Sequence, residues 1–349
     1  MSGYSTITGW GKYVPANVLT NADLEKMVDT SDEWIVSRTG IRERHIAGPN
    51  ETASTMGLAA AREALKVAGI EGKDLGLIIV ATVCPDYHFP SVGCIVQAQL
   101  GATCGAFDLE AACSGFLYAL SIAHQFTISG AAKHVLVIGV EKLSMYVDYT
   151  DRATCVLFGD GAGAAVVSAT DIPGGFHSFT LGSDGSRPEL LYVPTGGSAE
   201  PITEAALRER RHCIKMMGSD IFKFATRAMD ASSEFVLAEA GIKPEEIDLF
   251  LPHQANQRII DATARRLNLP PEKVFINIDR YGNTSAASIP IALCEAIEQG
   301  KIWPGAKIVF AAFGGGLTWG AAAMTWTTPI PESMIAAPPQ LNAAASSRA

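Results

Sequence analysis

The sequence is poor in the features that mark several protein classes. Only 18% of its 349 residues are charged and the formal net charge is −9, so the chain as a whole offers no positive field to hold nucleic acid. No two of the seven cysteines are spaced as CxxC, and their number is odd, which argues against a disulfide framework and a zinc ribbon. The first residues, Met-Ser-Gly-Tyr, lack the basic and apolar regions of a secretion signal. We therefore expect a reduced, cytoplasmic protein.

Apolar runs of membrane-spanning length are lacking as well. The longest uncharged stretch, 308–330, is broken by glycines at 314–316 and by several threonines, so it predicts two buried strands around a glycine turn. What the sequence does have is 48% hydrophobic residues and a mean hydropathy of +0.18. This composition requires a large core and excludes a disordered chain. We expect a globular protein that binds neither nucleic acid nor a membrane.

Comparison of the chain with itself reveals an internal repeat. Residues 68–80 and 240–252 share a helix end at Ala-Gly, a turn, and an apolar run that predicts a strand. Two further pairs of blocks repeat in the same order, namely 107–110 with 276–279 and 132–133 with 306–307. Three blocks in one order indicate a duplicated domain.

Each half of the chain alternates helical segments with apolar strands. The runs 77–83, 135–140 and 308–313 are almost entirely apolar, which is typical of strands buried on both faces of an α/β sheet. We predict an α/β fold with two similar halves and an Ala-, Pro- and Ser-rich tail, at residues 1–172, 173–328 and 329–349.

Cys113 is the residue best placed for nucleophilic chemistry. An apolar strand runs into the corner Ala-Ala-Cys-Ser-Gly at 111–115, and a helix is predicted from 114 to 129. The N–H groups and the macrodipole of a helix start favour a thiolate, so we expect a lowered pKa for Cys113. A backbone N–H at this corner can also hold an oxyanion. The other six cysteines are predicted to be structural.

The repeat brings two more polar residues to the same centre. Its second copy places Asn283 at the corner that matches Cys113, before a helix predicted at 286–299. His253 follows the apolar strand predicted at 247–251. Ligands of such sheets bind at the carboxyl ends of the strands, so a two-fold arrangement of the halves predicts that Cys113, His253 and Asn283 meet.

Seven motifs, spread over about residues 3–327, resemble the β-ketoacyl-[acyl-carrier-protein] synthase III family and occur in its order. They are D-T-S-D-E-W-I from Asp29, R-T-G-I-R-E-R from Arg38, A-A-C-S-G from Ala111, F-G-D-G-A-G-A-A from Phe158, P-H-Q-A-N from Pro252, G-N-T-S-A-A-S from Gly282 and F-G-G-G-L-T-W-G from Phe313. The resemblance implies the thiolase fold, a duplicated five-layer αβαβα arrangement. This expectation agrees with the internal repeat.

The resemblance also implies an activity. Members of the family are acyltransferases that join an acyl-CoA primer, usually acetyl-CoA, to malonyl-[acyl-carrier-protein]. The products are β-ketoacyl-[acyl-carrier-protein], CO2 and CoA, and the step initiates fatty-acid biosynthesis. The implied partners are an acyl carrier protein and an acyl-CoA. CoA thioesters are substrates here, so no cofactor and no metal are expected.

Family positions assign the catalytic roles. Cys113 takes the acyl group from CoA, and the backbone N–H groups of Cys113 and Gly315 hold the oxyanion of that step. Decarboxylation of a malonyl thioester creates an enolate, whose oxygen needs two neutral or cationic hydrogen-bond donors. His253 and Asn283 suit that requirement.

Other residues match the family's positions for binding CoA. Trp34 and Arg152 resemble the pair that sandwiches the adenine, for which an indole face and a guanidinium are suited. Arg38 and Thr30 resemble contacts to the nucleotide. Three residues are implied to meet the pantetheine: Phe222, Ala255 and Asn256.

Two protein interfaces are implied in the same way. Phe89 resembles the residue that crosses a homodimer interface to close the primer pocket of the other subunit, and Val83 lies just upstream, where primer length is set. A basic face on helices flanking His253 suits an acidic carrier protein, and its residues are Lys223, Arg258, Arg265 and Arg266. The sequence leaves open the primer length and the choice between fatty-acid and specialised metabolism.

Other functions compete with this one. A synthase III-like acyltransferase or a type III polyketide synthase-like enzyme of specialised metabolism shares the Cys-His-Asn set, although the polyketide synthases differ at Trp34 and Arg38. A hydrolase of the papain type also uses Cys, His and Asn but would lack the CoA-binding residues. A non-catalytic acyl-binding module is disfavoured because all three reactive residues are present.

Overall fold

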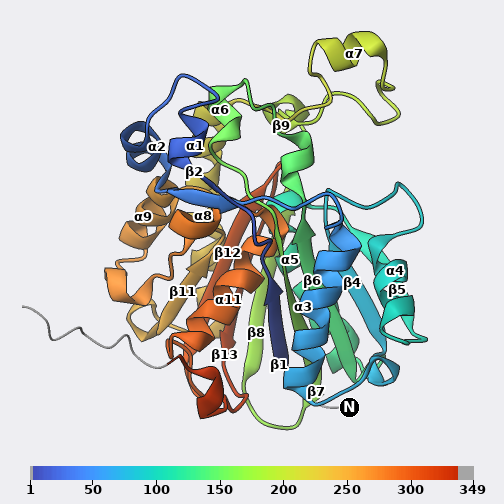
Figure 1. The fold of residues 1–349 in the computed structure, drawn as a ribbon. Coiled ribbons are helices and arrows are strands. Elements are labelled where there is room, and N and C mark those ends of the chain that lie inside the picture. The colour runs from blue at the N-terminus through green and yellow to red at the C-terminus, as the bar shows by residue number, and fades with distance from the viewer. Residues whose placement is uncertain (1–2, 337–349) are drawn as a thin grey trace, which may run out of the picture.

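The computed structural model describes residues 3–336 and contains two main β-sheets (Figure 1). The first has the strand order β1-β7-β6-β4-β5. In it β4 runs parallel to β5 and β6, whereas β7 is antiparallel to β1 and β6. The central strands are buried along almost their whole length, as their apolar sequences predict. The bounds are Tyr4–Tyr13 (β1), Leu77–Ala81 (β4), Gly105–Leu109 (β5), His134–Glu141 (β6) and Gly161–Thr170 (β7).

The second sheet repeats this arrangement. Its order is β11-β12-β13-β8, with β11 parallel to β12 and with β13 antiparallel to both β12 and β8. The counterpart of β5 is reduced to one parallel bridge, between Phe250 and Val274. The duplicated topology expected from the sequence is therefore present. The bounds are Gly175–Ser183 (β8), Leu249–Pro252 (β11), Lys307–Gly314 (β12) and Thr318–Thr325 (β13).

One block of the sequence repeat pairs unlike structures. Residues 107–109 are the end of β5, whereas 276–279 lead into the short helix α10 (Ile278–Tyr281). The equivalence predicted between 107–110 and 276–279 is therefore wrong. The reason is that the second sheet keeps only the bridge at Val274 in place of an edge strand.

Helices form three layers around the two sheets. Between the sheets lie α5 (Gly115–Ile128) and α11 (Ser288–Glu298), which share a core cluster with strands of both sheets. The outer face of the first sheet is covered by α3 (Ala53–Ala68). The outer face of the second sheet is covered by α8 (Gly218–Ala240) and α9 (Gln257–Arg266). Figure 1 shows this αβαβα order from α3 on one side to α8 and α9 on the other.

Shorter elements complete the fold. Leu24 and Ile35 share a small hydrophobic cluster with Cys84 and Leu143. Cys84 and Leu143 follow the carboxyl ends of β4 and β6, so some of these shorter elements lie over the strand ends. The elements are β2 (Val18–Thr20), α1 (Asn21–Leu24), α2 (Asp32–Thr39), β3 (Glu43–His45), α4 (Val92–Gln99), α6 (Arg152–Cys155), β9 (Leu191–Tyr192), α7 (Glu204–Arg208) and β10 (Lys215–Met216).

The packed chain continues past residue 328, where the sequence predicts the tail to begin. Ile330 and Met334 pack against the central core, and the Ala336 N–H donates to the Glu298 carbonyl at 2.6 Å. Residues 337–349 of the predicted tail lie outside the described residues. The uncharged stretch forms β12 and β13 around a glycine turn, as predicted. Within residues 3–336, no helix is long and apolar enough to cross a membrane.

Candidate active site

Cys113 lies in a tight 3₁₀ turn, Ala112–Ser114, between the end of β5 and the start of α5. Ala112 has a φ of 45°, in the left-handed region that residues with side chains seldom adopt. The turn packs against the end of β12, where a Cβ added to Gly314 would lie 2.7 Å from the Cys113 nitrogen. Only glycine permits this approach, so the glycine turn after β12 is held directly against the Cys113 turn.

The expected lowering of the Cys113 pKa is wrong for this structure. Burial raises the pKa of the thiol to about 12, although hydrogen bonds with the side chains of Ser285 and Asn283 act in the opposite direction. Cys113 also precedes Gly115, the first residue of α5, so it stands outside the regular helix. The thiol is therefore protonated at neutral pH. The hydrogen bonds with nearby groups favour its ionised form, the thiolate.

His253 follows the last residue of β11 and lies beside β12. Its backbone N–H donates to the Ala311 carbonyl at 2.8 Å, and its ring packs edge-on against Phe313 with the centroids 5.7 Å apart. The side chain is buried, and neither Nδ1 nor Nε2 has a hydrogen-bond partner among the described residues. Burial lowers the pKa of His253 to about 3, so the imidazole is neutral at neutral pH. Buried nitrogens without partners indicate that a bound molecule satisfies them.

Asn283 lies in the loop before α11, and hydrogen bonds fix its orientation. Its N–H donates to the Leu157 carbonyl at 2.8 Å, and its carbonyl accepts from the Gly159 N–H at 3.0 Å. The side-chain Oδ1 accepts from the Ser285 N–H at 2.9 Å. Because this oxygen is occupied by its own turn, Nδ2 is the part of the amide that can donate to a substrate.

The elements that carry the three predicted residues converge. The Cys113 turn contacts β12, to which the backbone of His253 is hydrogen-bonded. It also contacts the 3₁₀ turn Ser285–Ala287, which follows Asn283. A thiol and two neutral donors therefore share one buried region, which is suited to forming a thioester and stabilising an enolate oxygen. Among residues 3–336, no group of three His, Cys, Asp or Glu side chains could hold a metal ion.

The match between the two corners differs from the one read in the sequence. The turn Ser285–Ala287 before α11 takes the place of Ala112–Ser114 before α5, and Ser285 has a φ of 49°, like the 45° of Ala112. Asn283 thus lies two residues before the equivalent of Ala112 and not at the equivalent of Cys113. The prediction that these corners meet is unaffected by this shift.

Gly315 lies in the glycine turn that packs on the Cys113 turn. Thr318 joins the two turns, because its Oγ1 donates to the Ala111 carbonyl at 2.9 Å and lies 2.6 Å from the Ser114 Oγ. A Cβ added to Gly315 would lie 3.7 Å from that of Ala112. This proximity is compatible with an oxyanion site formed by the N–H groups of Gly315 and Cys113, which stays a prediction.

Trp34 and Arg152, which are predicted to hold the CoA adenine, lie together with Arg38, which is predicted to contact the nucleotide. The guanidinium carbons of Arg38 and Arg152 each lie 4.8 Å from the centroid of the Trp34 ring. Arg152 also donates to the Asp29 carbonyl at 2.8 Å. The Oγ1 of Thr30 is buried without a partner among the described residues. An adenine could stack on Trp34 by taking the place of one arginine.

Arg44 supports these residues and was not foreseen. Its buried guanidinium donates to the Val156 carbonyl at the end of α6, at 2.8 Å, and to the Asn21 Oδ1 at 2.9 Å. Asn21 in turn donates to Asp32 in α2 at 2.8 Å. Arg44 thereby links the helices that carry Trp34 and Arg152. These helices lie far apart in the sequence, so no local pattern predicts the link.

Asn256 makes two hydrogen bonds within the protein. Its Oδ1 caps α9 by accepting from the Arg258 N–H at 2.9 Å, and its Nδ2 donates to the Arg38 carbonyl at 3.0 Å. The side chain joins α9 to α2, and the predicted pantetheine contact of Asn256 stays a prediction. Ala255 is buried, and Phe222 lies beneath Arg258, whose guanidinium carbon is 5.3 Å from the ring centroid.

Comparison with known proteins identifies the family. A protein of Roseiflexus sp. named β-ketoacyl-[acyl-carrier-protein] synthase III is 52% identical over 328 residues, which cover 94% of this chain and 100% of that protein. The chain belongs to the β-ketoacyl-[acyl-carrier-protein] synthase III family. Family models described as 3-oxoacyl-[acyl-carrier-protein] synthase III and as its C-terminal part match residues 107–185 and 237–326. The chain is thus an acyltransferase of the condensing type.

Solved structures of synthase III enzymes confirm the fold. The 3-oxoacyl-[acyl-carrier-protein] synthase III of Aquifex aeolicus is 53% identical, with a TM-score of 0.85 over 92% of this chain and 100% of that one. The priming β-ketosynthase of the R1128 polyketide pathway is 35% identical, with a TM-score of 0.87 over 94% of this chain and 98% of that one. The predicted thiolase-like architecture is confirmed. The hydrolase alternative is not favoured by these relatives.

Sequence reasoning on this synthase III chain missed Glu141. It ends β6 and is fully buried, and burial raises the pKa of its carboxyl to about 7. The Val83 N–H and the Ser285 hydroxyl donate to it, each at 3.0 Å. The only sequence signal is an acidic residue at the end of an apolar run. Val83, the predicted primer-pocket residue, is therefore held in place by Glu141.

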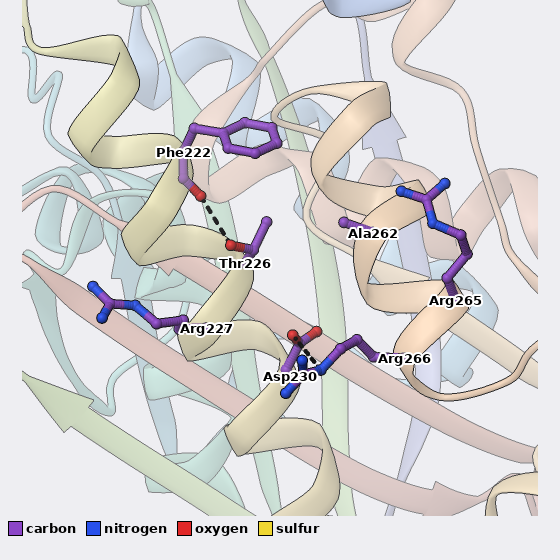
Figure 2. Close-up of a pocket in the computed structure, with 7 residues that line it drawn as sticks. All are labelled: Phe222, Thr226, Arg227, Asp230, Ala262, Arg265 and Arg266. Carbon is purple, nitrogen blue, oxygen red and sulfur yellow. Dashed lines mark hydrogen bonds and ion pairs between the residues drawn. The ribbon is translucent and has the colours of Figure 1, made fainter.

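Two predicted interaction surfaces of the synthase III chain are exposed. Phe89 precedes α4 and is 86% exposed. Of the basic residues, Lys223 lies on α8 and the others on α9. A groove between these helices is shown in Figure 2, where Arg266 pairs with Asp230 at 3.1 Å and is thereby partly neutralised. The groove is lined by Phe222, Thr226, Arg227, Asp230, Ala262, Arg265 and Arg266.

Proposed function

We propose that this synthase III chain condenses an acyl-CoA primer, with acetyl-CoA the first candidate, with malonyl-[acyl-carrier-protein]. The products are β-ketoacyl-[acyl-carrier-protein], CO2 and CoA, and the reaction initiates fatty-acid biosynthesis. One observation carries the proposal: a buried histidine with two unpartnered nitrogens and an oriented amide share a site with Cys113. These are the groups that acyl transfer followed by decarboxylation requires.

In the first half-reaction the Cys113 sulfur attacks the thioester carbonyl of the primer. The bond to the CoA sulfur breaks, CoA leaves with the proton of the Cys113 thiol, and acyl-Cys113 remains. The N–H groups of Cys113 and Gly315 hold the oxyanion formed on the way. Burial lowers the pKa of His253, so the imidazole is neutral, and we assign it the role of a hydrogen-bond donor and not that of the base for Cys113.

In the second half-reaction malonyl-[acyl-carrier-protein] loses CO2. The electron pair of the broken C–C bond moves to the thioester oxygen, where a neutral His253 and the Asn283 Nδ2 donate hydrogen bonds. The resulting carbanion attacks the acyl carbonyl on Cys113. Collapse of that intermediate expels the Cys113 thiolate and releases β-ketoacyl-[acyl-carrier-protein].

A single assay tests the function. The protein is incubated with acetyl-CoA and malonyl-[acyl-carrier-protein], and the carrier is weighed by mass spectrometry. We expect acetoacetyl-carrier that forms only when both substrates are present. Free acetate with unchanged carrier would identify a hydrolase, and extension of malonyl-CoA without the carrier would identify a polyketide synthase-like enzyme. A series of acyl-CoA lengths then defines the preferred primer.

Trp34→Ala is expected to weaken CoA binding. Loss of the indole removes the face on which the adenine stacks, an effect of about 1–2 kcal/mol, so the KM for acetyl-CoA should rise about tenfold. Steady-state kinetics measures the change. Trp303→Ala, at another partly exposed tryptophan, is the control and should leave KM unaltered. An unaltered KM in Trp34→Ala would remove Trp34 from the adenine site.

Arg258→Glu is expected to weaken docking of the carrier protein. Carrier proteins of this pathway are expected to be acidic, so a reversed charge beside the α8–α9 groove should raise the KM for malonyl-[acyl-carrier-protein] and reduce its salt dependence. Acetylation of Cys113 by acetyl-CoA should be unaffected. Arg208→Glu on α7 makes the same charge change on another segment and serves as the control. Equal KM values in the two variants would dismiss the groove as the docking site.

The proposal includes a homodimer. Two large aromatic side chains of the loop before α4 are exposed, Tyr87 at 61% and Phe89 at 86%, and together they support an interface there. Sedimentation should show a dimer at micromolar concentration and a weakened dimer for Phe89→Asp. A monomeric wild-type protein would contradict the assignment of Phe89 to the primer pocket of a second subunit. The cytoplasmic location expected from the sequence stays a prediction.

A further inference from the structure

The Glu141 carboxyl group joins segments that lie far apart in the sequence. Oε1 accepts a hydrogen bond from the Ser285 hydroxyl at 3.0 Å, and Oε2 accepts from the Val83 N–H at 3.0 Å and the Thr82 hydroxyl at 3.3 Å. Glu141 itself has no exposed surface. Burying a carboxyl is costly unless donors satisfy it, and these three donors satisfy Glu141. Replacing it with an apolar residue would leave the Val83 N–H without that partner.

Ser285 carries the effect of Glu141 to Asn283. With a φ of 49°, Ser285 adopts a backbone conformation that costs energy for any residue with a side chain. Its hydroxyl is held by Glu141, and its N–H donates to the Asn283 Oδ1 at 2.9 Å. If Ser285 relaxed to a negative φ, the segment that carries Asn283 and this N–H would rotate relative to α11, and the Asn283 amide would point in another direction.

We propose that Glu141 is a positioning residue for condensation. By holding Ser285 in its left-handed conformation, it keeps the Asn283 Nδ2 directed at the thioester oxygen of the malonyl group. Through Val83 it fixes the primer-pocket segment relative to the same turn. This inference rests on the proposed function of Asn283. Glu141 does not itself touch the substrate.

The test is a double-mutant cycle on enzyme that already carries an acetyl group on Cys113. We expect Glu141→Leu to slow the release of labelled CO2 from malonyl-[acyl-carrier-protein] about tenfold or more. Glu141→Gln retains an acceptor for Val83 and a partner for the Ser285 hydroxyl, so it should stay within about threefold of wild type. In an Asn283→Ala background, Glu141→Leu should cost less than about twofold, because the group that it positions is gone.

The cycle distinguishes positioning from general support of the fold. An equal loss in both backgrounds, or a fully active Glu141→Leu, would overturn the proposal. If Glu141→Leu fails to fold, Ser285→Ala replaces it in the cycle with the same expectations, since it removes the hydroxyl through which Glu141 reaches the turn. Wild type that releases no CO2 would refute the proposed function. Active wild type with additive losses would refute only the role of Glu141.

Discussion

Cys113→Ser is expected to slow acyl-enzyme formation by on the order of 10³-fold or more. A serine hydroxyl is a far weaker acid than a thiol, and burial already raises the pKa of the thiol at this position to about 12. His253, with its pKa lowered to about 3, offers no base strong enough to compensate. Intact-protein mass spectrometry after incubation with acetyl-CoA measures the acetylated fraction directly.

The control for this prediction is Cys94→Ser. Cys94 lies on α4 and is exposed, so its replacement should leave acetylation at the wild-type rate. Circular dichroism should show that both variants are folded. Normal acetylation of Cys113→Ser would place the nucleophile at another residue and would remove the basis of the proposed mechanism.

His253→Ala and Asn283→Ala should each slow decarboxylation about 10²-fold or more, the scale seen for lost oxyanion donors. Each variant removes one of the two donors to the enolate oxygen. Acetyl transfer to Cys113 should fall much less, because the low pKa of His253 makes it a donor and not a base, and because burial sets the Cys113 pKa more strongly than Asn283 does. Labelled acetyl-enzyme and labelled CO2 are measured on the same preparations.

His177→Ala is the matched control for His253→Ala. His177 lies on β8 and is exposed, so both half-reactions should proceed at wild-type rates. If His253→Ala stays folded but loses acetylation as completely as decarboxylation, His253 acts as the base for Cys113, as in a papain-type site. That result would overturn the division of labour proposed between Cys113 and the two donors.

The parts of the fold that could be predicted are those fixed by burial on both faces. The run 77–83 contains β4, which ends at Ala81, and the run 308–313 lies within β12, because a strand covered on both sides must be apolar along its length. The edge of the second sheet could not be predicted in this way. Its single bridge at Val274 leaves no periodic pattern, so 276–279 was matched with a strand that it does not form.

In the candidate site, too, some features could be predicted from the sequence and others could not. The internal repeat and the position of each residue after a predicted strand indicated that Cys113, His253 and Asn283 belong together, and their elements do converge. The partners of Asn256 within the protein could not be predicted in the same way: its amide caps α9 and donates to the Arg38 carbonyl. Side-chain hydrogen bonds depend on which segments become neighbours, and residue type does not specify that.

The sequence by itself determined the reactive groups of this synthase III chain and the order of its motifs, and through them its family and the duplicated α/β fold. Only the tertiary structure decided how those groups ionise. Desolvation by packed segments raises the Cys113 pKa and lowers that of His253, contrary to the thiolate expected from a helix start. The tertiary structure also decided the place of Glu141, whose bond to Ser285 spans 144 residues. Burial and long-range contacts arise when separate segments pack together, so local sequence does not encode them.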